Sequence, residues 1–179
     1  MAAVSDYSPV DDFQRLHVRP TPGRTLIVGS QIYAGKEDRR KRYPDAVGVD
    51  MLEGPGVDVV VDLEGPIPDD WAFSHIECMS VLEHSRRPWL LAANLQAMLE
   101  EGGTIYVAVP LMWRFHGYPS DYWRFTFQGI EALFPDIHWR AAAYAHTSLT
   151  PCDEKVPSKK IDGFPYYPRT ELLAFGVKA

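Results

Sequence analysis

Short apolar runs separated by polar segments recur along the first part of the chain. One run covers residues 24–29 and is closed by a glycine, and two more cover Ala46–Asp50 and 57–63, the last rich in β-branched residues. Runs of this length and composition predict buried strands. Between the first two, the charged segment 35–43 predicts a short helix that ends at Pro44.

The same alternation continues in the middle of the chain. Residues 75–80 and 104–109 predict the fourth and fifth strands. Between them, Pro88 suits the first turn of a helix, where its missing N–H removes no hydrogen bond. This helix carries leucine and methionine side chains on one face, and the pair Gly102-Gly103 predicts its end.

The C-terminal part predicts one more helix, at 128–133, and the last two strands, at 138–145 and 172–178. A long polar loop that includes residues 151–169 joins these two strands. The order of elements is typical of an α/β fold, and the apolar runs favour strands buried on both faces. We therefore predict a Rossmann-like, doubly wound, mostly parallel sheet in three α/β/α layers.

The chain is predicted to form one domain, because 179 residues suit a single hydrophobic core. This domain covers residues 23–179. Residues 1–22 are predicted to form an N-terminal arm or lid, since Pro20 and Pro22 interrupt the chain after it. Within this segment, residues 12–17 suit either a short helix that covers a site or a loose arm.

Composition narrows the classes of function. The formal net charge of −6 gives no reason to expect nucleic acid as a partner. The polar N-terminus predicts no signal peptide, and no apolar run of about eighteen residues predicts a membrane span. Cys78 and Cys152 form neither a disulfide framework nor a zinc-ligand spacing, so we expect a cytoplasmic protein without a metal site.

Residues at three predicted strand ends indicate a nucleotide-type cofactor, because ligands of doubly wound sheets bind beyond the carboxyl ends of the strands. Gly29 ends the first strand, where the backbone must turn close to a ligand. Asp50 ends the second strand about 20 residues further on, the spacing at which an acid holds ribose hydroxyls. Asp62 ends the third strand and, with Leu63, suits an adenine ring. The structural alternatives are a simple turn at Gly29 and a cap at Asp50.

The loop after the first strand limits the choice of cofactor. Residues 29–33 contain one glycine, where a loop that binds a dinucleotide pyrophosphate has three. A P-loop is also a poor match, because the spacing from Gly29 to Gly35 is too long and Glu37 replaces the hydroxyl residue that holds magnesium. The loop therefore suits a cofactor without phosphates.

The order of motifs resembles one known family. The matching positions are the glycine that ends strand one, Asp50, Val-Asp-Leu at 61–63, Cys-Met-Ser-Val-Leu-Glu-His at 78–84 and Gly-Gly-Thr at 102–104. Together they resemble the class I S-adenosylmethionine-dependent methyltransferases, and look closest to the small, uncharacterised bacterial group of the methyltransferase domain 11 type. The segment 116–126 is similar to one that follows strand five in related proteins. The chain departs from the family at Ile27, where an acid is usual.

The resemblance implies a seven-stranded sheet with an antiparallel last strand and S-adenosylmethionine as the cofactor. The residues that it assigns to cofactor binding are Gly29, Ser30, Asp50, Met51, Asp62, Leu63, Ser80, Val81 and His84. In this assignment Gly29 and Ser30 approach the methionine part, Asp50 holds the ribose, and Ser80 lies near the sulfonium. His84 equally suits a cap on the following helix.

The segment after strand five carries the candidates for chemistry and for acceptor binding. A general base is needed only where the acceptor must lose a proton, and the candidates for catalysis are His116, Asp121 and Tyr122. The candidates for binding a small, partly apolar acceptor are Trp113, Tyr118, Trp123 and Arg124. The alternative is structural, with the aromatic residues as core anchors and Asp121 and Arg124 as an ion pair.

The preferred prediction is a methyltransferase acting on an oxygen or nitrogen of a small-molecule or glycan-like acceptor. Residues 80–83 do not match the Asn/Asp-Pro-Pro-Tyr stretch of DNA amino-methyltransferases, nor the cysteine that cytosine-C5 chemistry needs there. Two other functions stay open. The degraded glycine loop fits a non-catalytic or regulatory domain, and Asp50 would also serve a dinucleotide-dependent oxidoreductase, which the missing glycines disfavour.

Overall fold

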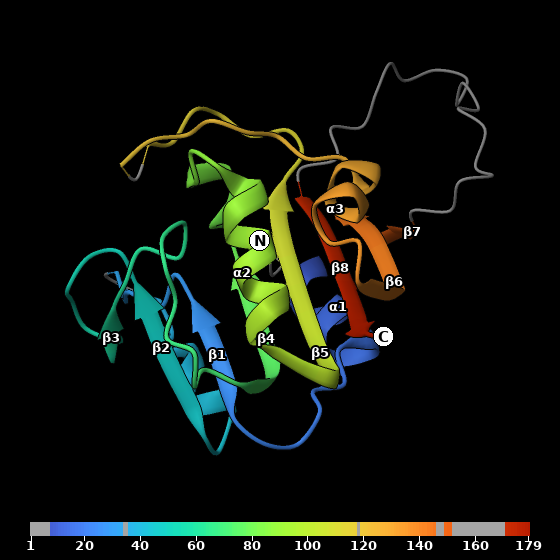
Figure 1. Cartoon of the computed structure of the whole chain (residues 1–179). Coiled ribbons are helices and arrows are strands. Elements are labelled where there is room, and N and C mark those ends of the chain that lie inside the picture. Colours follow the sequence, from blue (N-terminus) through green and yellow to red (C-terminus); the bar gives the residue numbers. More distant parts are fainter. Residues whose placement is uncertain (1–7, 34–35, 118, 146–148, 152–170) are drawn as a thin grey trace, which may run out of the picture.

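In the described part of the chain, eight strands form one sheet with helices on both faces (Figure 1). The computed structural model describes residues 8–33, 36–117, 119–145, 149–151 and 171–179. The elements are α1 Pro9–His17, β1 Thr25–Val28, the 3-10 helix η1 Arg39–Arg42, β2 Ala46–Asp50, β3 Val59–Val60, β4 Phe73–Met79, the 3-10 helix η2 Leu82–His84, α2 Pro88–Met98, β5 Leu99–Pro110, α3 Phe127–Leu133, β6 Ile137–Ala145, β7 Leu149–Pro151 and β8 Glu171–Lys178.

The sheet has the order β3-β2-β1-β4-β5-β8-β6-β7. The five strands from β3 to β5 are parallel, and β8 runs antiparallel between β5 and β6. The predicted doubly wound, mostly parallel sheet with an antiparallel last strand is confirmed. The short strand β7 adds an eighth, antiparallel strand at the edge beside β6.

The central strands are buried on both faces, as their apolar runs predict. Successive side chains of β5 point to opposite faces. Ile105 and Val107 pack in the larger core cluster with α2 and α3, whereas Tyr106 packs in a smaller cluster with Phe13 of α1. Figure 1 shows α2 and α3 on one face of the sheet and α1 on the other, which is the predicted three-layer arrangement.

Helix α1 lies on the sheet beside β6 and β8 (Figure 1). The side chain of Ser8 caps it by accepting a hydrogen bond from the backbone N–H of Asp11, and Pro9 begins it. Phe13 is fully buried. Residues 12–17 therefore form part of a packed helix, while the boundary at 22 and the lid role of residues 1–22 stay predictions.

Several predicted element boundaries are wrong. The helix predicted at 35–43 is only the single 3-10 turn η1 in its described part, because none of its residues is buried to hold a longer helix on the core. The strand predicted at 57–63 is reduced to β3, whose two valines are exposed at the sheet edge. Helix α2 ends at Met98 rather than at the glycine pair, because Leu99 is buried and already pairs with Phe73 of β4.

Among the described residues, no helix is both long and apolar enough to cross a membrane. The predicted loop at 151–169 and Cys152 fall outside the described residues, apart from Pro151.

His75 on β4 is a fully buried histidine that should make stability depend on pH. Its Nδ1 lies 2.9 Å from Thr104 Oγ1, and its Nε2 has no hydrogen-bond partner among the residues that the structure describes. Burial lowers its pKa from 6.5 to about 4. Between these two values the unfolded chain takes up a proton that the folded chain does not, so stability falls as the pH falls through this window.

We therefore expect the free energy of unfolding of the wild type to fall by about 2 kcal/mol more than that of His75→Gln between pH 7 and pH 4.5. Urea unfolding at a series of pH values measures this difference. His138→Gln, at an exposed position of β6, is the matched control and should keep the wild-type pH dependence. Parallel curves for the wild type and His75→Gln would contradict the assignment.

Candidate functional site

A cavity of about 650 Å³ opens at the carboxyl ends of the parallel strands. Its wall includes Val28 at the end of β1, Asp50 at the end of β2 and Met79 at the end of β4. The volume lies within the range of small-molecule and cofactor sites. This edge is the place where doubly wound sheets bind ligands.

The turn after β1 forms one wall of the cavity. Gly29 has φ +65°, in the left-handed region, and a Cβ there would lie 2.5 Å from Val81 Cγ2. The position therefore requires glycine for both its conformation and its close approach. Ser30 is buried, and its Oγ has no partner in the described part of the chain, so a polar group of a ligand would satisfy it.

Asp50 joins the loops after β1 and β2. Its Oδ2 accepts a hydrogen bond from the backbone N–H of Gln31, and its Oδ1 accepts one from the backbone N–H of Leu52, both at 3.2 Å. Each carboxylate oxygen keeps a further lone pair. Met51, next to it, is exposed and also lines the cavity.

The segment after β3 forms the opposite wall. Asp62 accepts a hydrogen bond from the backbone N–H of Glu64, and Leu63 is buried at the cavity wall. Glu64, which the sequence did not single out, accepts hydrogen bonds from Ser85 Oγ at 2.8 Å and from Arg87 Nε at 3.0 Å. It thereby ties this wall to the segment after η2.

The turn after β4 is strained where it meets the cavity. Ser80 has φ +53° and is the one non-glycine residue with positive φ in the described ranges. Its backbone N–H donates to the carbonyl oxygen of Ala108 on β5, which fixes the turn. Left-handed backbone at such a residue costs about 1–2 kcal/mol and is found mainly at functional sites. Val81 and His84 follow it and line the same cavity.

A buried ion pair fixes the position of Arg39 in the cavity wall. Glu77 on β4 is fully buried, accepts a hydrogen bond from Arg39 at 2.9 Å and accepts another from Tyr43 Oη at 2.7 Å. Arg39 also donates to the carbonyl oxygens of Val28 and Gly29 and lines the cavity. Arg39 belongs to the charged segment 35–43, yet its guanidinium points inward to a buried acid.

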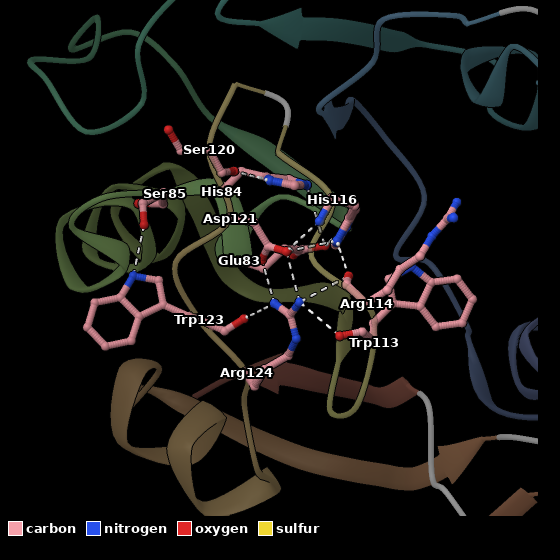
Figure 2. A network of polar contacts seen from close by, with 10 residues as sticks. All are labelled: Glu83, His84, Ser85, Trp113, Arg114, His116, Ser120, Asp121, Trp123 and Arg124. Atoms are coloured by element: carbon pink, nitrogen blue, oxygen red, sulfur yellow. Dashed lines mark hydrogen bonds and ion pairs between the residues drawn. The ribbon is translucent and has the colours of Figure 1, made fainter.

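Two histidines meet a buried carboxylate at the cavity wall (Figure 2). Glu83 is fully buried, and His84 Nε2 and His116 Nε2 each lie 3.8 Å from its Oε1. Neither oxygen of Glu83 has a hydrogen-bond partner within the described ranges. Burial raises the pKa of Glu83 to about 7, and the same cause lowers the pKa of His84.

Behind the histidines, the segment after β5 is held by a second set of contacts (Figure 2). Asp121 Oδ2 lies 3.0 Å from His116 Nδ1 and accepts a hydrogen bond from the backbone N–H of His116. Arg124 donates to both carboxylate oxygens of Asp121 and holds its pKa well below the usual range. The predicted ion pair of Asp121 and Arg124 thus forms, without a helix around it.

The remaining predicted residues lie around this segment. Trp113 is half exposed and lines the cavity. Trp123 donates from Nε1 to the carbonyl oxygen of Ser85, which holds the segment against η2. Tyr122 lines a smaller neighbouring hollow, and hydrogen bonds with Ser120 and Arg86 lower its pKa. Tyr118 lies outside the described residues.

The structure thus brings all nine predicted cofactor residues, together with His116 and Trp113, to one cavity. Asp121 and Arg124 lie outside its lining, behind His116, and Trp123 lies to one side (Figure 2). Tyr122 lines the neighbouring hollow instead. Sequence reasoning missed Arg39, Glu64 and Glu77. An acid inside the apolar run of β4 was the available signal for Glu77, because a buried carboxylate requires a partner.

Comparison with family models and with curated proteins gives no match to this sequence. Solved structures do match. An S-adenosylmethionine-dependent methyltransferase from Thermotoga maritima aligns over 97% of this chain and 90% of its own, with a TM-score of 0.62 and 13% identity. The 1,6-didemethyltoxoflavin N1-methyltransferase of Burkholderia thailandensis, with bound 1,6-didemethyltoxoflavin and S-adenosylhomocysteine, aligns over 88% and 72%, with a TM-score of 0.62 and 13% identity.

The N-methyltransferase NodS of Bradyrhizobium japonicum, in complex with S-adenosylhomocysteine, aligns over 87% of this chain and 78% of its own, with a TM-score of 0.57 and 13% identity. At these identities the likeness concerns the fold. The chain has the fold of the class I S-adenosylmethionine-dependent methyltransferases, as the order of its motifs predicted.

Proposed function

We propose that this protein binds S-adenosylmethionine in the cavity and transfers its methyl group to an oxygen or nitrogen of a small-molecule or glycan-like acceptor. The observation that carries the proposal is that nine residues, chosen from the order of motifs alone, all line one cavity of about 650 Å³. They come from four separate loops, so chance proximity along the chain does not explain their meeting.

The residues present fit this cofactor. Ser30 Oγ is buried and has no hydrogen-bond partner in the described part of the chain, so it can bond a polar group of the cofactor. Asp50 is held by two backbone amides and keeps lone pairs for two ribose hydroxyls. The single glycine at the turn suits a ligand that brings no pyrophosphate to the loop.

Catalysis here depends mainly on alignment, because methyl transfer is an in-line displacement. When bound, S-adenosylmethionine supplies an electrophilic methyl group. Trp113 and His116 line the same cavity as the cofactor residues, and we assign acceptor contact to them. Asp121 acts as a positioning residue, because it holds the Nδ1 side of His116 and does not reach the cavity.

Isothermal titration calorimetry with S-adenosylmethionine, S-adenosylhomocysteine and NAD tests the proposal. We expect both sulfur compounds to bind and NAD to bind at least about 100-fold more weakly, since the loop lacks the glycines that a pyrophosphate needs. Tight binding of NAD instead would favour the oxidoreductase. If none of the three binds, the methyltransferase proposal is overturned. The remaining hypothesis is then a non-catalytic or regulatory domain with this fold.

A further inference from the structure

The cluster of Glu83, His84 and His116 has a geometry that cofactor binding does not explain. One carboxylate oxygen and two imidazole nitrogens lie within 4.8 Å of one another. Glu83 and His84 come from η2, and His116 comes from the segment after β5, so two separate parts of the chain aim these groups at one point (Figure 2). All three residues line the cavity.

The carboxylate of Glu83 lacks a partner among the other described residues. Its side chain is fully buried, and neither oxygen accepts a hydrogen bond from any other residue in these ranges. The two imidazole nitrogens at 3.8 Å are too distant to donate one. A buried carboxylate without a partner is costly, so a further group is expected between the oxygen and the nitrogens.

The contacts of the two Nδ1 atoms, on the far sides of the imidazole rings, indicate which kind of group lies between Glu83 and the Nε2 atoms. His84 Nδ1 faces the carbonyl oxygen of Ser120, and His116 Nδ1 faces Asp121 Oδ2 at 3.0 Å. Both partners are acceptors, so each Nδ1 carries the proton and donates it. Each Nε2 then presents a lone pair toward Glu83, and lone pairs that face a carboxylate repel it unless a proton or a metal ion lies between them.

We propose that Glu83, His84 and His116 bind one divalent transition-metal ion, with Zn²⁺ as the best fit to two imidazoles and one carboxylate. Ligand atoms around a tetrahedral zinc ion lie about 3.4 Å apart, so the 3.8 Å separations close by small side-chain rotations. All three ligand residues line the cavity, so a fourth ligand to the ion would come from its contents.

The surroundings match those of known metal ligands. A histidine ligand commonly donates its second ring N–H to a carboxylate or a backbone carbonyl, which fixes its orientation. Asp121 does this for His116, and the carbonyl of Ser120 does it for His84. Arg124, a nearby cation, pairs with Asp121, and Glu171 is one of several further acids that line the cavity.

The sequence predicted no metal site, because its two cysteines lack a zinc-ligand spacing, whereas the proposed ligands include two histidines from different segments. With the ion bound, His116 acts on an acceptor through the metal and not as a free base. Metal binding stands apart from the proposed methyl transfer, and calorimetry with Zn²⁺ alone tests it without the cofactor.

The test uses the full chain after treatment with a chelator. Zn²⁺ titration, metal analysis after dialysis and the visible spectrum with Co²⁺ should show one ion per chain with nitrogen and oxygen ligands and no thiolate band. Glu83→Gln and His116→Ala should each weaken Zn²⁺ binding by about 100-fold or more. His138→Ala, at an exposed position of β6, is the matched control and should bind as the wild type does.

Stability without metal separates loss of a ligand from loss of the fold. Glu83→Gln removes a buried charge that has no partner in the described structure, so its melting temperature without metal should equal or exceed that of the wild type. Saturating Zn²⁺ should raise the melting temperature of the wild type by about 5 °C or more and leave that of the variant unchanged. Absence of Zn²⁺ binding to the wild type, or binding that survives in both variants, would overturn the proposal.

Discussion

Replacing Arg39 by methionine should lower the free energy of unfolding by about 3 kcal/mol, because it leaves the carboxylate of Glu77 buried without its cationic partner. Glu77 is fully buried and Arg39 is 18% exposed, so solvent screens this pair only weakly. The hydrogen bond from Tyr43 remains and offsets part of the loss. The carbonyl oxygens of Val28 and Gly29 also lose their donor, which loosens the turn beside the cavity.

Urea unfolding measures this effect against a control pair with the same separation. Arg15 and Asp12 on α1 are also 2.9 Å apart, but Arg15 is 69% exposed. Arg15→Met should therefore cost about 0.5 kcal/mol or less. The double variant Arg39→Met/Glu77→Gln should recover much of the lost stability, because it removes the unpaired charge. Equal costs for Arg39→Met and Arg15→Met would show that burial does not strengthen the inner pair.

Replacing Asp50 by alanine should weaken binding of S-adenosylhomocysteine by about 100-fold, since two charge-assisted hydrogen bonds to ribose hydroxyls are worth about 3 kcal/mol. The carboxylate is already fixed by the amides of Gln31 and Leu52, so it needs no ordering when the ligand binds. Calorimetry on the wild type and the variant gives the ratio of the two dissociation constants.

Asp70→Ala is the control for this measurement, because Asp70 is exposed and lies outside the cavity. It should bind S-adenosylhomocysteine as the wild type does. Circular dichroism and thermal unfolding of both variants show that the fold is kept. An unchanged affinity in Asp50→Ala, with an intact fold, would remove the ribose role from this carboxylate.

The fold was predictable where a strand lies in the middle of the sheet. The apolar runs of β1 and β5 are buried on both faces, so their composition alone marks them. At the edge of the sheet the side chains are exposed, so burial does not determine where a strand begins and ends. The β-branched run at 57–63 therefore predicted a longer strand than β3. Within that run, the side chain of Asp58 accepts hydrogen bonds from Gly48 and Arg40.

The cavity residues were predictable to the extent that each follows the end of a parallel strand. Gly29 and Asp50 satisfy this rule, and their meeting follows from the strand order. The contact of Arg39 with Glu77 was not predictable, because it depends on the path of a loop that carries no periodic pattern. Pairing of a buried acid with a distant cation is decided by packing in three dimensions.

The segment after β5 shows the same division. Its chemistry-bearing residues were visible in the sequence, but their orientation was not. Asp121 lies outside the cavity lining and pairs with Arg124, and the backbone N–H of Tyr122 donates to the carbonyl oxygen of Glu83. These contacts hold the segment in place although its described residues form neither helix nor strand. No periodic pattern in the sequence therefore predicts them.

Trp113 gives the cavity an optical reporter of its own. Trp71, Trp89, Trp123 and Trp139 do not line the cavity, whereas the indole of Trp113 does so at half exposure. A ligand that covers this ring removes water from it and shifts its fluorescence emission toward shorter wavelengths. The occupancy of the cavity can therefore be followed in solution by light, without a label and without knowing the acceptor.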